Sequence, residues 1–210
     1  MSTPPGLRER KKQRTRETIA RAARELFAER GYHATTLPDI AEAADVSTRT
    51  IFAYFPSKED ILFSDFVLMK QALAQALAER PEGEEALVTV REFMVSRVAA
   101  GKSKLDEQIG RCIHDDDTLR SHLRARLAQL EEVIAPAIAR DLGAPEADFR
   151  PQLVAASLTA AFNLLSERGR TLRTAEDVAA QIDPVIAFLR GGLAALKEPA
   201  KDRSTGPTPL

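Results

Sequence analysis

Four side chains that hydrogen-bond readily, Ser47-Thr48-Arg49-Thr50, stand at the start of a short segment with helical apolar spacing. Side chains of this kind contact base edges when a helix presents them in the major groove of DNA, and an arginine there is a bidentate donor to guanine. Arg14 lies upstream in a dense basic run, and Lys58 begins the next predicted helix, where a phosphate would lie. These types and positions indicate DNA recognition.

Three predicted helices position these side chains. In the first, apolar residues recur at i, i+3, i+4, i+7 and i+8 from Ile19 to Phe27, and Gly31 ends it as a C-cap residue. Thr36 begins a second, short helix and Ser47 begins a third, with a tight turn over 44–47 between them. This is the spacing of a helix-turn-helix, whose second helix enters the major groove.

Helical spacing continues along the rest of the chain, and no segment alternates like a half-buried strand. We therefore expect an all-α fold. A DNA-binding domain, made of a basic arm and the helix-turn-helix, is predicted over 1–57, and an effector-binding and dimerisation domain of roughly six helices over 58–197. Residues 198–210, rich in Pro, Ser, Thr and Gly, are expected to form a disordered tail. The six helices are predicted at 58–79, 84–99, 103–112, 118–141, 147–168 and 175–196.

Composition and charge narrow the class of protein. The 210 residues are 44% hydrophobic and 29% charged, as in ordinary globular proteins, and no apolar run approaches the ~20 residues of a membrane-spanning helix. Cys112 is the single cysteine, which excludes an intrachain disulfide and favours a cytoplasmic location. Residues 1–58 carry 11 Lys and Arg against 7 Asp and Glu, whereas the whole chain has a net charge of -1. The basic end therefore suggests contact with a polyanion, although a solvated charge run is the simpler reading.

Five segments of the first third of the chain form a recognisable series: Ile19-Ala20-Arg21-Ala22-Ala23-Arg24-Glu25-Leu26-Phe27, Gly31-Tyr32, Thr35-Thr36-Leu37-Pro38-Asp39-Ile40-Ala41, Val46-Ser47 and Tyr54-Phe55-Pro56-Ser57-Lys58-Glu59. Through them residues 15–62 resemble the DNA-binding domain of the tetracycline-repressor (TetR) family of bacterial regulators. The later helices resemble the family's ligand-binding and dimerisation domain in number and length. Ser47-Thr48-Arg49-Thr50-Ile51-Phe52 and Ala139-Arg140-Asp141-Leu142-Gly143 further resemble the subgroup with a mycofactocin-regulator type of C-terminal domain.

The resemblance implies a role for the polar residues of this region. Thr36 would cap the second helix and bond to a phosphate, as helix N-termini do. Phe52 and Tyr54 would pack on the sugar-phosphate backbone, with the Tyr54 hydroxyl donating to a phosphate. Arg49 stands where the family commonly has glycine, and Phe52 where it has tyrosine, so the base preference of other members is not transferred. The remaining implied contacts are those of Thr48, Arg49 and Thr50 with bases and of Lys58 with a phosphate.

An effector pocket is expected among the helices after residue 58, because their apolar faces are broader than packing between two helices needs. Arg97 would orient an anionic ligand end, although such an arginine more often extends to the surface. Asn163 is similar, with an ordinary buried hydrogen bond as its alternative. The fourth helix, which begins at Lys58, would transmit ligand binding to the DNA-binding domain. The predicted pocket residues are Phe66, Met69, Phe93, Arg97, Phe162 and Asn163.

A dimer interface is expected on the last two helices. Apolar residues of the final helix form a long seam, and small residues there and on the preceding helix permit close approach. A seam buried within one subunit is the alternative. The predicted interface residues are Ala156, Ala160, Val178, Ile182, Val185, Leu189, Gly192 and Leu196.

Metal binding and catalysis are the weaker interpretations. The stretch Cys112-Ile113-His114-Asp115-Asp116-Asp117 contains metal-ligand types, but the simpler reading is that Asp116 or Asp117 caps the following helix. No phosphate loop, nucleophile elbow or zinc-protease motif is present. We therefore expect a homodimeric transcriptional regulator without cofactor or metal, most simply a repressor that an unidentified small molecule releases from a palindromic operator. A helical protein-interaction module that binds no DNA is the alternative.

Overall fold

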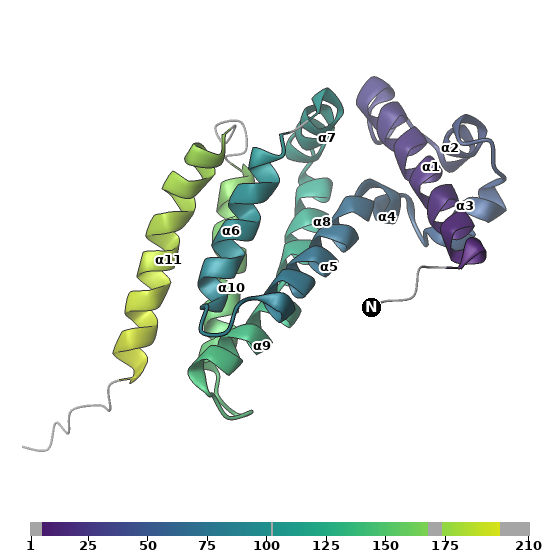
Figure 1. The fold of residues 1–210 in the computed structure, drawn as a ribbon. Helices are drawn as coiled ribbons and strands as arrows, with labels where there is room; N and C mark the ends of the chain where they lie inside the picture. Colours follow the sequence, from purple (N-terminus) through teal and green to yellow (C-terminus); the bar gives the residue numbers. More distant parts are fainter. Residues whose placement is uncertain (1–5, 102, 168–173, 198–210) are drawn as a thin grey trace, which may run out of the picture. The chain divides into compact units, whose positions relative to one another are not determined.

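The computed structural model describes residues 6–101, 103–167 and 174–197, with side chains over 6–101, 103–165 and 174–195. Every regular element in these ranges is an α-helix, as expected from the sequence. The predicted tail 198–210 lies outside the described residues. The helices, labelled in Figure 1, are α1 (Leu7–Arg30), α2 (Leu37–Ala43), α3 (Thr48–Tyr54), α4 (Lys58–Leu62), α5 (Ser64–Glu79), α6 (Ala86–Ala99), α7 (Lys104–His114), α8 (Asp117–Ala128), α9 (Glu131–Leu142), α10 (Arg150–Glu167) and α11 (Ala175–Lys197).

The contacts of the chain group it into two compact units, and the predicted domains 1–57 and 58–197 stay predictions. The first comprises 1–75 and 100–129, and the second comprises 76–99 and 130–210. The first unit therefore joins the helix-turn-helix to α4, α7 and α8, which the sequence had suggested belong to the effector-binding domain. One boundary falls inside α5, which continues without interruption from one unit into the other.

Two long predicted helices are each divided in the structure. The helix expected over 58–79 breaks at Phe63, where four consecutive residues, 61–64, are buried. A straight helix lying on a surface cannot bury four residues in succession, and the turn at Phe63 resolves this conflict. The helix expected over 118–141 breaks at Gln129 and Leu130, where the chain passes from the first unit to the second.

The core of the first unit lies between α1 and the helices packed on it, which include α2, α4 and α7. Ion pairs reinforce this packing at its edges. Arg24 of α1 pairs with Asp65 of α5 and Asp106 of α7. Arg126 of α8 pairs with Asp60 of α4. The largest fully buried side chains of this unit are Ile19, Phe27, Ile40, Ile51, Phe55, Ile61, Leu73 and Leu119.

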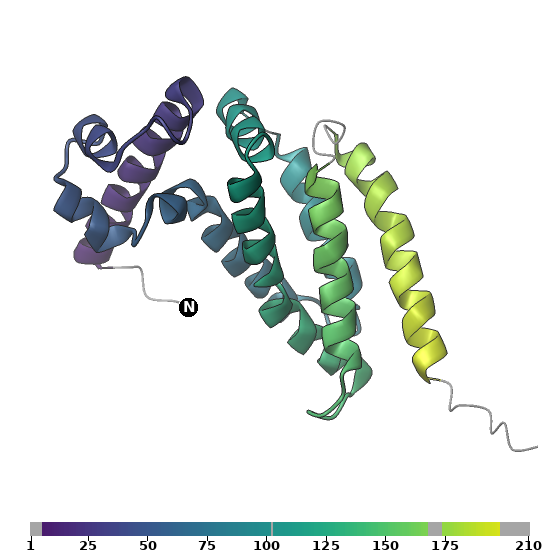
Figure 2. The ribbon, with the colours of Figure 1, turned by 180° about the vertical axis from the view of Figure 1, so that it is seen from behind.

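In the second unit, α6 and α10 form the main contacts with the final helix, α11, and α9 packs against α10 (Figure 2). Arg91 of α6 pairs with Asp183 of α11, and Arg190 of α11 donates to Glu85 at 2.8 Å. The α11 segment Ala175–Ala195 is long and apolar enough to cross a membrane by length and composition, and 22% of its most apolar window is buried. The two ion pairs join α11 to α6 and to Glu85, the residue before α6.

Candidate DNA-binding site

The turn between α2 and α3 fixes the position of the recognition helix. Asp45 adopts a left-handed conformation with φ of 52°, which an aspartate tolerates better than most side chains. The backbone N–H of Val46 then donates to the Ala41 carbonyl at 2.9 Å, which closes the turn. On either side, Ile40 and Ile51 are fully buried and hold the two helices together.

Both helices begin with a side-chain cap, as predicted. The Thr36 hydroxyl accepts from the Asp39 N–H at 3.3 Å, and the Asp39 carboxylate accepts from the Thr36 N–H at 2.7 Å, which completes a capping box. Hydrogen bonds from the Thr36 hydroxyl and N–H hold the pKa of Asp39 below its usual range. The Ser47 hydroxyl accepts from the Thr50 N–H at 3.0 Å and lies 2.7 Å from the Thr50 hydroxyl.

The α3 helix separates a buried face from a solvent face. Ile51 is buried and the following cap residue, Phe55, is 1% exposed, so they anchor the helix. Arg49 is exposed on the opposite side, and Phe52, three residues further, is 55% exposed. Residues three apart share a helix face. The predicted base-reading arginine and backbone-packing aromatic therefore stand together on the solvent face, with Thr48, Thr50 and Tyr54 half-exposed along the same helix.

Arg16 secures the other end of α3, a role that the sequence analysis did not assign. Its guanidinium donates to the Tyr54 carbonyl at 3.0 Å and lies 4.4 Å from the centre of the Phe55 ring. The first contact satisfies a carbonyl that has no partner within the helix, and the second is a cation–π contact. This role was not predictable from the sequence, because Arg16 is one of several arginines in the basic run.

Lys58 is more constrained than expected. Its ammonium donates to the Tyr32 carbonyl at 2.9 Å and to the Thr35 carbonyl at 2.8 Å, and lies over the Tyr32 ring. An ammonium has three donors, so one remains for the predicted phosphate contact. Lys58 thus ties the start of α4 to the segment between α1 and α2. Burial and the negative charge of Glu59 raise the pKa of Tyr32 far above its usual value, so this phenol stays neutral.

The basic arm is helical from Leu7 onward. Arg14 and the basic residues before it belong to α1 and are exposed to solvent. They extend α1 beyond the part that packs on α2, so their charges are fixed on a rigid element rather than on a flexible segment. Such an array attracts the phosphate backbone of DNA independently of sequence. The exposed basic side chains are Arg8, Arg10, Lys11, Lys12 and Arg14.

The stretch around Cys112 has a structural role. The Asp116 carboxylate accepts from the Leu119 N–H at 2.9 Å and caps α8, which confirms the simpler reading of this segment. That hydrogen bond is the main reason that the pKa of Asp116 lies below its usual range, and the hydrogen bond with His33 is the second reason. In the part of the chain that the structure describes, no group of three or more His, Cys, Asp and Glu side chains is arranged to hold a metal ion.

The expected effector residues fall on both units. Phe66 and Met69 belong to the first, and Phe93, Arg97, Phe162 and Asn163 belong to the second. Phe66 and Phe162 are buried, whereas Met69, Phe93 and Asn163 are half-buried. Arg97 is exposed, with its guanidinium 5.9 Å from the centre of the Phe93 ring, as expected for an arginine that extends to the surface. Their convergence on one pocket stays a prediction.

The expected dimer residues also divide into two groups. Val178, Ile182 and Leu189 are at most 6% exposed within the single chain, so this seam packs inside the protomer rather than on its surface. Val185 is half-buried, and the Leu196 side chain lies outside the described residues. The physical reason is that α11 covers α6 with its most regular apolar stripe. Ala156, Ala160 and Gly192 are exposed and remain available for a partner.

Fold and site together define a helix-turn-helix DNA-binding protein. The model of the bacterial regulatory proteins of the tetR family matches residues 19–64, and the MftR C-terminal domain model matches residues 84–194. The transcriptional regulator TcmR of Streptomyces glaucescens is 34% identical over 79% of this chain and 78% of its own length. The chain therefore belongs to the TetR family of transcriptional regulators, with a C-terminal domain of the MftR type.

Other similar proteins agree with this assignment. A Mycobacterium tuberculosis protein assigned as the mycofactocin biosynthesis regulator MftR is 31% identical over 70% of this chain and 75% of its own length. Among solved structures, NalD of Pseudomonas aeruginosa, a repressor of a multidrug efflux pump, has a TM-score of 0.58, with 21% identity and coverage of 83% and 96% of the two chains. FadR of Thermus thermophilus, solved with lauroyl-CoA, has a TM-score of 0.55, with 24% identity and coverage of 93% and 99%. At these identities the two structures support the fold.

Proposed function

We propose that this TetR-family regulator is a cytoplasmic repressor that binds a palindromic operator as a homodimer and is released by a small-molecule effector. The observation that carries the proposal is that α3 has two different faces. Ile51 and the cap residue Phe55 are buried, while Arg49 and Phe52 face solvent. The protein would act by binding rather than by catalysis.

An exposed apolar face on α10 and α11 supports the homodimer. Leu153 and Leu164 of α10 are 47% and 61% exposed, and Phe188 of α11 is 76% exposed. Ala156 and Ala160 lie between the two leucines on the same side of α10, and Gly192 lies one turn beyond Phe188. Figures 1 and 2 show α10 and α11 side by side. Large exposed apolar side chains next to small ones suit a two-fold interface of four helices, two from each subunit.

A two-fold dimer matches a palindromic operator, because each subunit presents the same recognition helix to one half-site. Half-sites lie about 34–36 Å apart, or a multiple of this distance, for adjacent grooves on one side of the duplex. Arg49 would donate to a guanine in each half-site, and the exposed basic residues of α1 would contact phosphates.

The effector is proposed to have an apolar body and one polar or anionic end. The buried Phe162 of the second unit would contact the body, and Arg97 or Asn163 of the same unit would orient the end. The lauroyl-CoA bound to the similar FadR structure is a ligand of this type. The chain from Lys58 through α5 connects the DNA-binding elements to the second unit, so it is the route by which ligand binding would reach α3.

The proposal is tested with the purified full-length protein and fragments of the genome that encodes it. We expect retention of a small set of fragments, with an affinity that falls steeply as salt increases. Lauroyl-CoA should release the retained fragment, whereas coenzyme A without the acyl chain should not. Binding of no fragment at any salt concentration would favour the protein-interaction alternative. Binding that neither compound affects would place the effector in another chemical class.

A further inference from the structure

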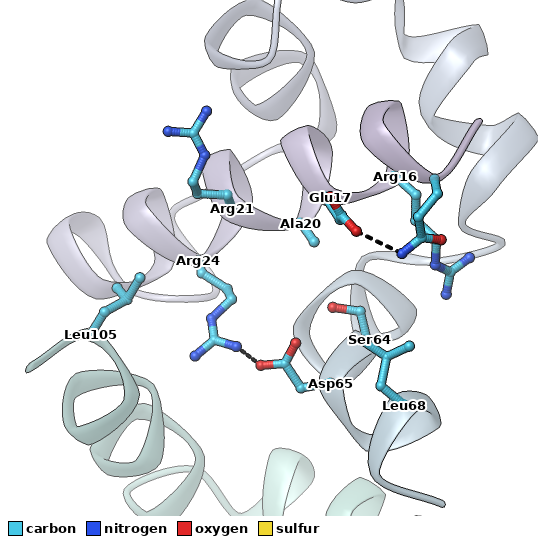
Figure 3. A pocket seen from close by; sticks show the side chains of 10 residues that line it. Arg16, Glu17, Ala20, Arg21, Arg24, Ser64, Asp65, Leu68 and Leu105 are labelled. Carbon is cyan, nitrogen blue, oxygen red and sulfur yellow. Dashed lines mark hydrogen bonds and ion pairs between the residues drawn. The ribbon is translucent and has the colours of Figure 1, made fainter. Parts of the chain in front are cut away.

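A cavity lies within the first unit, and its lining includes none of the predicted effector residues (Figure 3). Its volume is about 260 Å³, and α1, α5 and the start of α7 provide its walls. Ala20 of α1, Leu68 of α5 and Leu105 of α7 supply apolar surface. Leu68 is 52% exposed, so a leucine at this cavity has no protein partner covering much of its side chain.

Ser64 is the unusual polar residue of this cavity. The residue is 6% exposed, and its hydroxyl is buried with no hydrogen-bond partner. Figure 3 shows the hydroxyl pointing into the space between Ala20 and Asp65. A buried hydroxyl without a partner is unfavourable, and most such groups in proteins are satisfied by another polar group. Ser64 is thus positioned to bond an occupant of the cavity.

The charged residues around the cavity already have partners or point elsewhere. Arg24 is paired with Asp65 and with Asp106, and the Glu17 carboxylate accepts from Gln13 at 2.8 Å. Arg16 is occupied at the end of α3, as described above. Arg21 is exposed and points away from the cavity in Figure 3. An ionic ligand would have to displace these partners and lose its own hydration, whereas a neutral ligand would not.

We propose that this cavity binds a small, neutral, mainly apolar molecule that carries one hydroxyl group, such as a phenol or a small alcohol. The hydroxyl bonds to Ser64, and the apolar body packs on Ala20, Leu68 and Leu105. Because α1 forms one wall and also supports α2, the occupant contacts the DNA-binding elements directly. Its binding therefore changes operator affinity, and operator DNA changes the ligand's affinity by the same factor.

Four probes of similar size and different chemistry test the proposal: benzyl alcohol, toluene, benzoate and benzylamine. The full-length protein carries ¹³C-labelled methyl groups, and the methyl signals of Ala20, Leu68 and Leu105 report on the cavity. We expect saturable shifts of these three signals with benzyl alcohol, at an affinity about tenfold above that of toluene or of either charged probe, because hydrogen bonding to Ser64 favours the alcohol. Methyl signals of the second unit serve as the internal reference.

Two variants separate the site from general solvent effects. Ser64→Ala removes a hydroxyl without a partner, so the variant should fold normally and bind benzyl alcohol and toluene equally well. Ala20→Leu fills the cavity and should abolish binding of both probes. Ser96→Ala, which changes an exposed serine of α6, is the matched control and should leave binding unchanged.

Three results would overturn the proposal. The first is the absence of saturable shifts with any probe, which would mean that the cavity holds water only. The second is unchanged preference for benzyl alcohol in Ser64→Ala. The third is tighter binding of benzoate or benzylamine than of the alcohol, which would assign the site to ions. A test of operator release by lauroyl-CoA is independent of all three, so failure of either proposal is recognised separately.

Discussion

The Lys58 ammonium lies 2.9 Å from the Tyr32 carbonyl oxygen and 4.2 Å from the centre of the Tyr32 ring. A residue that the sequence assigns to a DNA phosphate therefore also holds the start of α4 against the segment between α1 and α2. Its second carbonyl partner, Thr35, is fully buried. Both roles have consequences that experiments can separate.

Lys58→Ala should lower both stability and operator affinity. Loss of the ammonium leaves the Thr35 carbonyl without its partner and the Tyr32 carbonyl with the Thr35 N–H alone, at 3.4 Å. We expect a cost of about 1–3 kcal/mol in the free energy of unfolding. If the third donor reaches a phosphate, the slope of log affinity against log salt should also flatten by about 0.9. Denaturant unfolding and DNA titration at several salt concentrations measure the two effects. Lys12→Ala, at an exposed lysine of α1, should change the slope alone, and an unchanged stability of Lys58→Ala would contradict the fastening role.

Arg49→Ala should relax base preference at one position in each half-site. Loss of a bidentate contact with guanine costs about 1–3 kcal/mol of discrimination, and the exposed position of Arg49 means that folding is unaffected. Titration against operators with single base changes measures the preference. Arg111→Ala, at an exposed arginine of α7, is the matched control. Full affinity and unchanged preference in Arg49→Ala would remove Arg49 from base recognition.

The same substitution at two adjacent residues of α11 should have two different effects, one on dimerisation and one on folding. Phe188→Asp changes a side chain that is 76% exposed, so we expect folded monomers that bind the operator weakly. Leu189→Asp changes a side chain that is 6% exposed and should unfold the second unit, because an unpaired carboxylate enters the core. Light scattering and circular dichroism distinguish the outcomes. A dimeric Phe188→Asp would place the interface on another face.

Acid should weaken the first unit through Asp60. Burial by itself raises the pKa of this carboxyl, but its bonds with Arg126 and Ser57 outweigh burial and hold the pKa below its usual value. Asp60 therefore stabilises the fold above pH ~4, and this contribution is lost as the pH falls through the lowered pKa. Asp60→Asn should be less stable than the parent at pH 7, with a difference that shrinks toward pH 3. Glu25→Gln, at an exposed carboxylate of α1, is the control. A difference independent of pH would contradict the assigned cause.

Local patterns of the DNA-binding region were predictable from the sequence. Thr36 and Ser47 cap their helices because a hydroxyl at that position bonds the third N–H of the helix, which depends on neighbouring residues alone. Ile51 and Phe55 are buried as helical spacing requires. Short-range rules suffice here because each contact spans a few residues.

Contacts between distant segments were not predictable in the same way. Arg16 bonds to Tyr54, 38 residues away, and nothing in its own neighbourhood distinguishes it from other arginines of the basic run. The apolar seam of α11 has the spacing of an interface, yet spacing does not specify whether the partner is another subunit or α6 of the same chain. The break at Phe63 likewise arises from burial on two sides, which a single-helix pattern does not contain.

Two copies of this chain should read a palindrome through Arg49. Selection from a random-sequence DNA library with the full-length protein, followed by sequencing, tests it most directly. We expect an inverted repeat with a guanine at matching positions of both half-sites and half-site centres about 10–10.5 base pairs apart or a multiple of this spacing. The same selection with Arg49→Ala should retain the repeat and lose the guanine. Enrichment of a single unrepeated motif, or of no motif at all, would show that the protein does not read a palindrome through Arg49.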